Sequence, residues 1–305
     1  MSGRPADAAP APAVAGRLAR LGAVVHGGRP RALAVGQQLA KWTAGQGIEL
    51  RTLSSERGCL GEDVPCADPA DFAKGLDLVV VLGGDGTLLR ALGLTLVEQV
   101  PVLGVNLGHL GFLTEVEADG LVPALEAVQA GRYQVERRIT LAARTFVGGE
   151  EVGLDLAVND LVLDKAAKER LATVAVHVGG RLFARYTADG IMVATPTGST
   201  AYSFSAGGPI VSPLLDALLL TPIAPHMVFN RSLVLHPYEV VRLEVQGDSA
   251  VAESVDGRAV RELPPGSVVE VGRGMLPALL VRVHSPDFYG LVRSKFRLAD
   301  GGEAG

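Results

Sequence analysis

The feature that most constrains this chain is an apolar run that ends in a glycine-rich loop. Leu78–Leu82 contains five apolar, β-prone residues, and the pentapeptide Gly83–Thr87 (Gly-Gly-Asp-Gly-Thr) follows at once, before a stretch of helix formers. This order is typical of a buried strand, a tight loop and a helix. Gly83, Gly84 and Gly86 can take positive φ and let backbone N–H groups approach a ligand closely. The pattern predicts an anion site, most naturally for phosphate, at a helix N-terminus.

The loop also contains a carboxylate, Asp85, which phosphate would repel. Its charge therefore indicates a chemical use, because beside phosphates a carboxylate can accept the proton of an attacking hydroxyl or hold a metal ion. Thr87 and Arg90 follow in the helix-forming segment and are further candidates for phosphate contact. The alternative is an ordinary Gly-Asp-Gly turn with Thr87 as a helix cap. The spacing matches neither the Walker signature nor the dinucleotide fingerprint with three glycines.

Strand-like and helix-like segments alternate around this loop. Leu21–Val25 and Ile48–Leu53 are apolar and β-prone, and the segment 31–45 between them is typical of a helix. The alternation predicts an open parallel α/β sheet in the N-terminal domain. The Asp85 loop would lie at the carboxyl end of a strand, where such sheets bind ligands.

In the second half of the chain, short β-like segments separated by turns replace the helices. We therefore expect a mostly antiparallel, β-rich second domain, in which Asp256-Gly257 forms a hairpin turn. The expected boundaries are a disordered leader at 1–19, an α/β domain at 20–141 and the β-rich domain at 142–286. Phe288–Phe296 is apolar and basic, and we expect it to pack against the rest of the protein.

Composition excludes several classes of protein. The formal net charge of −5 at pH 7 argues against general nucleic-acid binding, which requires a basic face. No apolar run reaches membrane-spanning length, so we expect no membrane partner. Cys59 and Cys66 are too few for a disulfide scaffold and too far apart for a redox or zinc pair, which favours a reducing cytoplasm.

A second glycine-punctuated loop follows the strand-like run that begins at Pro101. It carries Asn106, His109 and Phe112, and we expect it to lie beside the Asp85 loop. A catalytic and a structural role are both open for His109, and Phe112 either shelters a ring or fills the core.

Two stretches of the second half combine polar groups with the character of buried strands. Asn159 and Asp160 interrupt the apolar run 157–163, and they either close a turn or bind a ligand, because unpaired buried polar groups cost free energy. In the stretch 195–208, Gly198 and three hydroxyl residues are typical of a short, capped helix. Small hydroxyl side chains suit a polyol or a purine edge, and an ordinary serine-threonine cap is the alternative.

Together these stretches resemble the NAD kinase (ATP-NAD kinase) family in its bacterial form, from about Leu21 to Leu298. The Gly-Gly-Asp-Gly-Thr loop is shared with lipid kinases such as diacylglycerol and sphingosine kinases. Two other runs are similar to nucleotide-site signatures that lipid kinases lack: Gly104-x-Asn106-x-Gly108-x-Leu110-Gly111-Phe112-Leu113 and Thr195-Pro196-Thr197-Gly198-Ser199-Thr200-Ala201-Tyr202.

The resemblance implies transfer of the γ-phosphoryl group of ATP, assisted by Mg²⁺, to the 2′-hydroxyl of the adenosine ribose of NAD. The product is NADP, and Asp85 is the implied general base. The resemblance also implies a homodimer or homotetramer in which Asp189 reaches a neighbouring subunit's site. In such proteins the second domain binds NAD, and a C-terminal segment, here 287–305, completes the first domain. ATP or inorganic polyphosphate as donor, and NAD or NADH as acceptor, stay open.

By the same resemblance Asn159 and Asp160 contact NAD, although the family's usual glutamate is aspartate at position 160. The other residues implied to bind nucleotide are Gly83, Gly84, Gly86, Thr87, Arg90, Asn106, Phe112, Asp189, Thr197, Thr200, Ala201, Tyr202 and Ser205. No metal-ligating residue is assigned. The alternatives are a lipid kinase of the same superfamily, with an apolar acceptor channel in place of 195–208, and a non-catalytic dinucleotide sensor, which the intact Asp85 disfavours.

Overall fold

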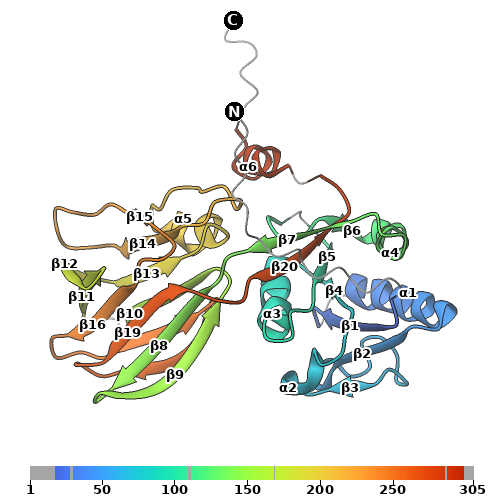
Figure 1. Cartoon of the computed structure of the whole chain (residues 1–305), viewed down its shortest axis with the longest axis horizontal. Helices are drawn as coiled ribbons and strands as arrows, with labels where there is room; N and C mark the ends of the chain where they lie inside the picture. The colour runs from blue at the N-terminus through green and yellow to red at the C-terminus, as the bar shows by residue number, and fades with distance from the viewer. Residues whose placement is uncertain (1–17, 28–29, 109–110, 168, 286, 299–305) are drawn as a thin grey trace, which may run out of the picture. The chain divides into compact units, whose positions relative to one another are not determined.

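The computed structural model describes residues 18–27, 30–108, 111–167, 169–285 and 287–298. The chain divides into two compact units: the first contains residues 1–137 and 279–305, and the second contains residues 138–278. Figure 1 labels their helices and strands along the chain. His109 and nearly all of the expected leader lie outside the described residues.

The first unit is built on a sheet of mostly parallel strands. β1 pairs in parallel with β2 and β4, and β5 pairs in parallel with β4 and β20, in the order β3-β2-β1-β4-β5-β20-β7 with β6 beside β5. The strands are β1 (Arg20–Val25), β2 (Glu49–Leu53), β3 (Cys66–Ala67), β4 (Leu78–Leu82), β5 (Val102–Asn106), β6 (Val116–Glu117), β7 (Gln134–Arg138) and β20 (Ala278–Arg282). The helices are α1 (Pro30–Gln46), η1 (Ser54–Glu56), α2 (Pro69–Phe72), α3 (Asp85–Thr95), η2 (Ala118–Gly120), α4 (Leu121–Gln129) and α6 (Phe288–Phe296). The predicted open parallel α/β sheet is confirmed.

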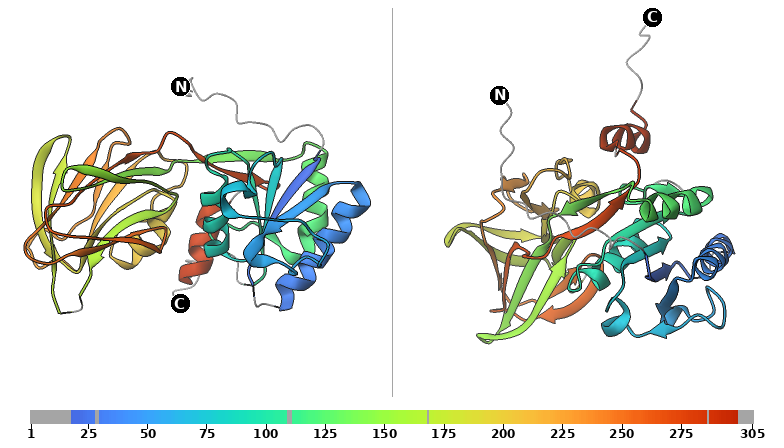
Figure 2. Two further views of the ribbon diagram at one scale, coloured as in Figure 1. Left: turned by 90° about the horizontal axis from the view of Figure 1, so that it is seen from below. Right: turned by 45° about the vertical axis from the view of Figure 1, so that its right-hand side comes forward.

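Helices cover both faces of this sheet. α1 contacts α4 and α2 contacts α3, and the two pairs lie on opposite faces (Figures 1 and 2). Every residue of β4 is therefore buried, which explains the unbroken apolar run Leu78–Leu82. Within the described ranges, no helix is both long and apolar enough to cross a membrane.

The strand order also determines where a ligand can bind. From β1 the chain adds β2 and β3 on one side and then returns to add β4 and β5 on the other. The connections that leave β1 and β4 at their carboxyl ends therefore diverge, which is the topological switch point where open α/β sheets bind ligands. The Gly-Gly-Asp-Gly-Thr segment follows β4 directly and lies at this point.

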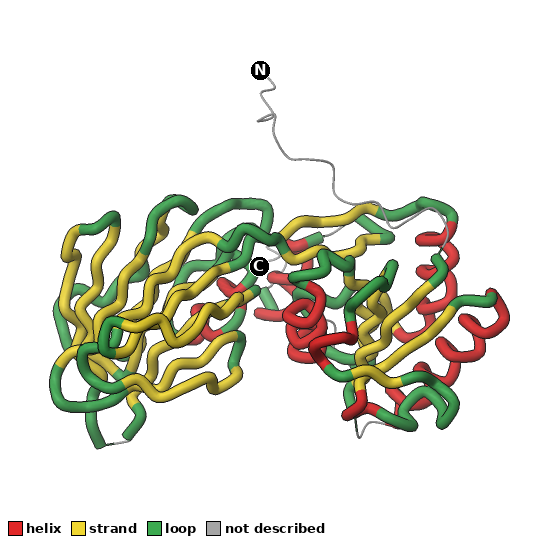
Figure 3. Tube along the Cα trace, turned by 60° about the horizontal axis from the view of Figure 1, so that its bottom comes forward, coloured by secondary structure: helices red, strands yellow, loops and turns green. Residues whose placement is uncertain are grey.

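The regular secondary structure of the second unit is almost entirely strand, as Figure 3 shows. In the described part of the chain they form two six-stranded sheets, ordered β15-β14-β13-β10-β17-β18 and β12-β11-β16-β19-β8-β9, with antiparallel pairing throughout. The strands are β8 (Leu141–Val147), β9 (Glu150–Ala157), β10 (Asp160–Lys165), β11 (Ala172–Val178), β12 (Arg181–Ala188), β13 (Gly190–Ala194), β14 (Leu218–Ile223), β15 (Leu233–Leu235), β16 (Val241–Gln246), β17 (Val251–Val255), β18 (Arg258–Leu263) and β19 (Val268–Arg273). Between β13 and β14 are two short helices, η3 (Gly198–Thr200) and α5 (Tyr202–Ser205).

One hydrophobic core joins the two sheets of the second unit. Leu161 and Ile191 of one sheet belong to the same buried cluster as Val174 and Leu243 of the other. The inner faces therefore pack on each other as in a β-sandwich. The predicted antiparallel, β-rich second part of the chain is confirmed.

The Asp256-Gly257 turn is confirmed and accounts for one difference from the sequence-based expectation. Asp256 and Gly257 have φ of +48° and +73°, as a tight two-residue hairpin requires. The apolar run 157–163 does not form one strand, because β9 ends at Ala157 and β10 begins at Asp160. It breaks at Val158 and Asn159 because their N–H groups bond to the side chain of Asp256 instead of to a neighbouring strand.

The apolar-basic segment forms α6, which belongs to the first unit. The ring of Phe112 lies 6.3 Å from that of Phe288 and 6.4 Å from that of Phe296, measured between centroids. No residue of α6 is fully buried, and Tyr289 is largely exposed. The expected packing is therefore present but shallow.

A buried ion-pair network connects β20 to the segment that follows β5. The side chain of Arg282 is 7% exposed and pairs with Glu136 at 2.7 Å and Glu115 at 3.3 Å. It also donates to the carbonyl of Leu113, while Glu115 accepts from the N–H groups of Val283 and His284. This network holds the chain on both sides of Leu113 in place.

We predict that Arg282→Ala lowers the free energy of unfolding by roughly 3–5 kcal/mol, because two carboxylates that are only 10% and 11% exposed lose their shared cation. Arg132→Ala, at an exposed position of the same unit, is the control and should change it by less than about 0.5 kcal/mol. Denaturant unfolding of both variants measures the difference. Equal unfolding midpoints for the two would contradict a structural role for the network.

Candidate functional site

The first turn of α3 is an open set of backbone donors. The helix begins at Asp85, so Asp85, Gly86 and Thr87 form its first turn, and no side chain caps it. The alternative of Thr87 as a cap is therefore wrong. The first N–H groups of an α-helix have no partner within the helix, so this end remains available to an anion.

The glycines of this segment avoid a side-chain clash at one position and leave the backbone accessible at two others. None of Gly83, Gly84 and Gly86 has positive φ, so that part of the expectation is wrong. A Cβ on Gly83 would lie 2.5 Å from Oγ1 of Thr87, whereas a Cβ on Gly84 or Gly86 would meet nothing within 4 Å. The backbone at Gly84 and Gly86 is thus bare on the side where a ligand can approach.

The carboxylate of Asp85 is held by the loop after β5. Its Oδ2 accepts from the N–H of Phe112 at 2.8 Å, and its Oδ1 accepts from those of Leu113 at 3.1 Å and Thr114 at 3.4 Å. A Cβ on Gly111 would lie 1.9 Å from Oδ1 of Asp85, so only glycine permits this approach. The two glycine-rich loops therefore meet, as expected, and they meet at Asp85.

The other residues of the second glycine motif shape the same loop. The side chain of Asn106 accepts from the N–H of Gly108 and donates to its carbonyl, which closes a tight turn. A Cβ on Gly104 would lie 2.4 Å from Leu88, so α3 packs directly on β5. Asn106, which we expected to contact nucleotide, is buried and uses its amide within the protein.

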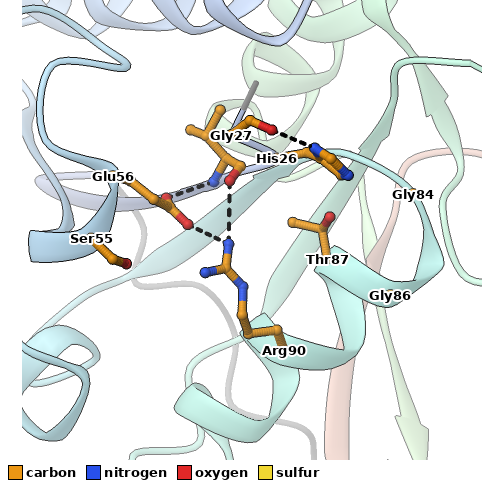
Figure 4. A pocket seen from close by; sticks show the side chains of 9 residues that line it. His26, Gly27, Ser55, Glu56, Gly84, Gly86, Thr87 and Arg90 are labelled. Carbon is orange, nitrogen blue, oxygen red and sulfur yellow. Dashed lines mark hydrogen bonds and ion pairs between the residues drawn. The ribbon is translucent and has the colours of Figure 1, made fainter. Parts of the chain in front are cut away.

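A pocket of about 600 Å³ opens at the switch point (Figure 4). It is lined by the chain after β1, by η1 and by the first two turns of α3: Val25, His26, Gly27, Ser55, Glu56, Gly84, Gly86, Thr87 and Arg90. Gly84, Gly86, Thr87 and Arg90 are predicted site residues. Asp85 is not among the lining residues, because its carboxylate faces the Phe112 loop.

Glu56 and Arg90 form an ion pair in this pocket, and Figure 4 shows the guanidinium directed at the glutamate. Sequence reasoning missed Glu56, His26 and Ser55, although all three follow strands that end at the carboxyl edge of a parallel sheet. Their place after these strands could have identified them as candidate site residues. The ion pair itself joins residues 34 positions apart and has no local pattern.

In the second unit, Asp256 holds the Asn159-Asp160 pair. Its carboxylate accepts from the N–H groups of Val158 at 2.9 Å, Asn159 at 2.7 Å and Asp160 at 3.2 Å. The side chain of Asn159 is buried, yet its Oδ1 has no hydrogen-bond partner among the described residues. A buried acceptor without a donor is costly, so this atom is suited to a ligand's N–H or O–H.

The hydroxyl-rich stretch packs directly on this pair. The N–H of Thr195 donates to the carbonyl of Asn159, and its Oγ1 donates to that of Val158. A Cβ on Gly198 would lie 2.3 Å from the Asn159 carbonyl oxygen. The motif that begins at Thr195 and the Asn159 segment are therefore one assembly.

The residues of the hydroxyl-rich stretch fall into two groups: buried ones that bond within the protein, and more exposed ones that a ligand can reach. Thr195, Ser199 and Ser203 are fully buried, and Ser199 bonds to both backbone groups of Val211. Among the predicted site residues, Thr197 is buried, and its hydroxyl accepts a hydrogen bond from Arg138. Thr200 and Ala201 are half-buried, whereas Tyr202 and Ser205 are exposed. The expected helix cap is found only in part: the N-cap residues of η3 and α5 make no side-chain bond to their helices, but Oγ1 of Thr195 accepts from the N–H of Gly198, the first residue of η3, at 3.2 Å.

Acidic side chains gather around Asp160. Burial, followed by the charges of Asp256 and Asp164, raises the pKa of Asp160 to about 7. Burial also raises the pKa of Asp256, although its three N–H bonds oppose this shift by stabilising the charged form. Burial, with Asp164, Asp189 and Asp160 nearby, also raises the pKa of Tyr202. Asp189 itself pairs with Lys165.

An open parallel sheet with an uncapped helix N-terminus and an arginine at its switch point defines an α/β protein whose pocket is suited to phosphorylated ligands. The comparisons with known proteins specify the family. Residues 65–133 match the ATP-NAD kinase N-terminal domain, and residues 158–283 match the ATP-NAD kinase C-terminal domain. The chain belongs to the NAD kinase family, and the resemblance found in the sequence is confirmed.

Relatives in this family match over most of their length. NAD kinase 2 of Streptomyces avermitilis is 40% identical over 291 residues, which cover 92% of this chain and 95% of that protein. NAD kinase of Heliobacterium modesticaldum is 41% identical over 278 residues, which cover 91% of this chain and 98% of that protein.

Solved structures agree with the fold. Yeast NADH kinase complexed with NADH has a TM-score of 0.86 at 25% identity, covering 95% of this chain and 90% of that chain. An NAD kinase from Archaeoglobus fulgidus in complex with ATP has a TM-score of 0.67 at 24% identity, covering 92% of this chain and 99% of that chain.

The raised pKa of Asp160 predicts a pH-dependent stability. Between the ordinary aspartate pKa of about 3.9 and the native value of about 7, the native state binds more protons than the unfolded state. Stability therefore falls as pH rises through this window and levels off above it. Asp160→Asn removes the titration, so wild type should lose roughly 2–3 kcal/mol relative to this variant between about pH 5 and pH 8.

Denaturant unfolding of both proteins across this range measures the effect. The exposed Asp248, changed to Asn, is the control and should follow wild type. Parallel pH profiles for wild type and Asp160→Asn would show that Asp160 is charged throughout.

Proposed function

We propose that this protein transfers the γ-phosphoryl group of ATP to the 2′-hydroxyl of the adenosine ribose of NAD. In this reaction the bond between the γ-phosphorus and the β,γ-bridging oxygen breaks, a bond from phosphorus to O2′ forms, and ADP leaves. The hydroxyl proton passes to a base of the enzyme, and NADP is the product. Family membership supports the reaction class, and the pocket at the switch point supports the donor site.

The observation that carries the donor site is the uncapped N-terminus of α3 in a pocket with an arginine. The bare backbone at Gly84 and Gly86 presents N–H donors, and Arg90 adds a fork of guanidinium donors. The volume of about 600 Å³ is within the usual range for small-molecule sites. We assign the ATP phosphates to this pocket, and inorganic polyphosphate presents the same chemistry.

Asp85 is the proposed general base. An ionised carboxylate offers about four lone-pair positions, and three of those on Asp85 accept N–H groups of the Phe112 loop. The remaining capacity can accept the 2′-hydroxyl proton as the phosphoryl group arrives. The three N–H bonds would fix the direction in which the carboxylate presents that lone pair.

The second unit is the proposed NAD-binding domain. Asn159 has a buried acceptor without a partner, and Asp160 lies next to it on β10. Thr200, Ala201, Tyr202 and Ser205 are at least partly accessible and are assigned to adenine and ribose. Asn106 is proposed to act on nucleotide binding indirectly, because its amide shapes the loop that carries Phe112.

We also propose that Mg²⁺ accompanies ATP. Among the described residues, no three His, Cys, Asp or Glu side chains are grouped so as to hold a metal ion. A site that uses one or two carboxylates, waters and the phosphates of the substrate needs no such group, so the residues present fit an ion held largely by ATP. Bound there, Mg²⁺ would neutralise phosphate charge, while Arg90 and the N–H groups of α3 orient the phosphates.

Two further proposals follow from the family resemblance: a homodimer or homotetramer, and a role for Asp189 at a neighbouring subunit's site. A third, a location in the cytoplasm, follows from the cysteine content. The pairing of Asp189 with Lys165 is compatible with such a role, because both side chains are partly exposed. The free thiols Cys59 and Cys66 fit a reducing compartment.

Mass spectrometry after incubation with NAD, ATP and Mg²⁺ tests the function, with NADP and ADP as the expected products. Parallel incubations with polyphosphate and with NADH identify the preferred donor and acceptor. Absence of a phosphorylated dinucleotide in all four combinations would reject the proposal in favour of a dinucleotide sensor.

We predict that Asp85→Asn lowers turnover by about a hundred- to ten-thousand-fold, the usual range for general acid–base help. NAD affinity, measured by calorimetry, should change little. Because Asn offers one acceptor oxygen in place of two, some contacts with the Phe112 loop are lost as well. The variant must therefore be compared with one that disturbs the loop alone.

Gly111→Ala is that comparison, since the added Cβ displaces the Asp85 carboxylate without removing its charge. Its turnover should fall less than that of Asp85→Asn. Equal losses of turnover and of melting temperature in the two variants would assign Asp85 a purely structural role.

We further predict that Asn159→Ala weakens NAD binding by roughly 1–3 kcal/mol and leaves ATP binding almost unchanged. Its stability should change little through hydrogen bonding, because Oδ1 has no partner among the described residues. The exposed Asn230, changed to Ala, is the control. Calorimetry that finds equal losses for both nucleotides would mean that Asn159 supports the fold.

A further inference from the structure

We infer that Glu56 is a positioning residue of the phosphoryl-donor pocket, which holds the guanidinium of Arg90 in the orientation that binds phosphate. The inference deepens the proposed function and rests on its assignment of the donor phosphates to this pocket. Glu56 belongs to η1, and Arg90 lies in the second turn of α3.

The contacts of Arg90 within the protein use one of the three nitrogens of its guanidinium. Nη2 donates to the carbonyl of Val25 at 3.2 Å and to Oε1 of Glu56. A guanidinium has five N–H donors, and those on Nη1 and Nε have no acceptor among the described residues. The side chain lines the pocket and is 41% exposed. The donors on Nη1 and Nε are therefore available to phosphate oxygens as single, charge-assisted hydrogen bonds.

Glu56 is fixed far more tightly than Arg90. Its side chain is 4% exposed, and its Oε2 accepts from the N–H of Val25 at 2.7 Å and from the hydroxyl of Thr52 at 3.2 Å. Oε1 is left for Arg90. The glutamate is thus anchored to β1 and β2, the strands at one side of the switch point, and it holds an arginine that comes from the other side.

Because Glu56 is fixed and Arg90 is not, the ion pair affects how strongly Arg90 can bind phosphate. A long, part-exposed arginine loses rotamer freedom when it binds a ligand, which weakens affinity. Here the buried glutamate has already ordered it, so less freedom is lost when phosphate binds. Lysine could not replace it fully, because an ammonium has three donors and bonds to Glu56 and Val25 would leave only one for phosphate, whereas the guanidinium keeps three.

Glu56→Gln tests the inference, since it keeps size and an acceptor for Val25 but removes the charge that holds Arg90. Calorimetry with inorganic tripolyphosphate should show affinity about tenfold weaker than wild type, the effect of one lost charge-assisted contact. Steady-state kinetics should show a similar rise in KM for ATP, with KM for NAD changed less than about twofold. Glu126→Gln, an exposed change on α4, is the matched control and should match wild type.

The double variant distinguishes positioning from general support of the fold. With Arg90→Ala present, Glu56→Gln should add less than about a twofold loss, because Glu56 acts through Arg90. Full additivity, or equal rises in both KM values, would overturn the inference. If Glu56→Gln does not fold, Arg90→Lys replaces it in the test. This variant should bind tripolyphosphate about tenfold more weakly than wild type. Unchanged affinity would overturn the inference.

The tripolyphosphate measurement needs no turnover, so the two proposals can fail separately. Wild type that forms NADP while Glu56→Gln binds tripolyphosphate normally contradicts the inference alone. Wild type that forms no NADP while Glu56→Gln binds tripolyphosphate more weakly contradicts the proposed reaction and retains the role of Glu56.

Discussion

Three consecutive backbone N–H groups, those of Phe112, Leu113 and Thr114, converge on the carboxylate of Asp85. Much of the first unit is arranged around this contact. The buried strand β4 brings Asp85 to the carboxyl edge of the sheet, and β5 brings the loop that donates to it. Gly111 permits the close approach, and Arg282 holds the carbonyl of Leu113 from the other side. A charge that would repel phosphate is thereby satisfied by the protein, beside a helix terminus that remains open.

The second unit uses the same device at Asp256, which accepts the N–H groups of Val158, Asn159 and Asp160. In both units a carboxylate organises a turn of backbone by replacing the hydrogen bonds that a strand would make. The consequence differs, because burial, followed by the nearby charge of Asp256, raises the pKa of a second carboxylate, that of Asp160. At neutral pH, Asp160 is therefore present both as the protonated acid, which can donate a hydrogen bond, and as the carboxylate, which only accepts.

The sequence predicted the parts of the structure that depend on local pattern. The apolar run before Gly83 identified the central strand, and alternating segments identified the parallel sheet. What it could not predict depends on contacts between distant residues. The Glu56–Arg90 and Arg282–Glu115 pairs have no local signal, and the purpose of Gly111 becomes visible only once Asp85 is placed beside it. The hydroxyl of Ser199 likewise bonds to Val211, 12 residues along the chain, which no local pattern predicted.

The central claim is that the first turn of α3 is the phosphate site of the first unit. Amide chemical shifts measured during titration with inorganic tripolyphosphate test it most directly. The account predicts that the largest changes occur at the N–H groups of Gly84, Asp85 and Gly86, with saturation, and that the Nε–H of Arg90 shifts with them. Saturable changes confined to the second unit, with these signals unmoved, would contradict it.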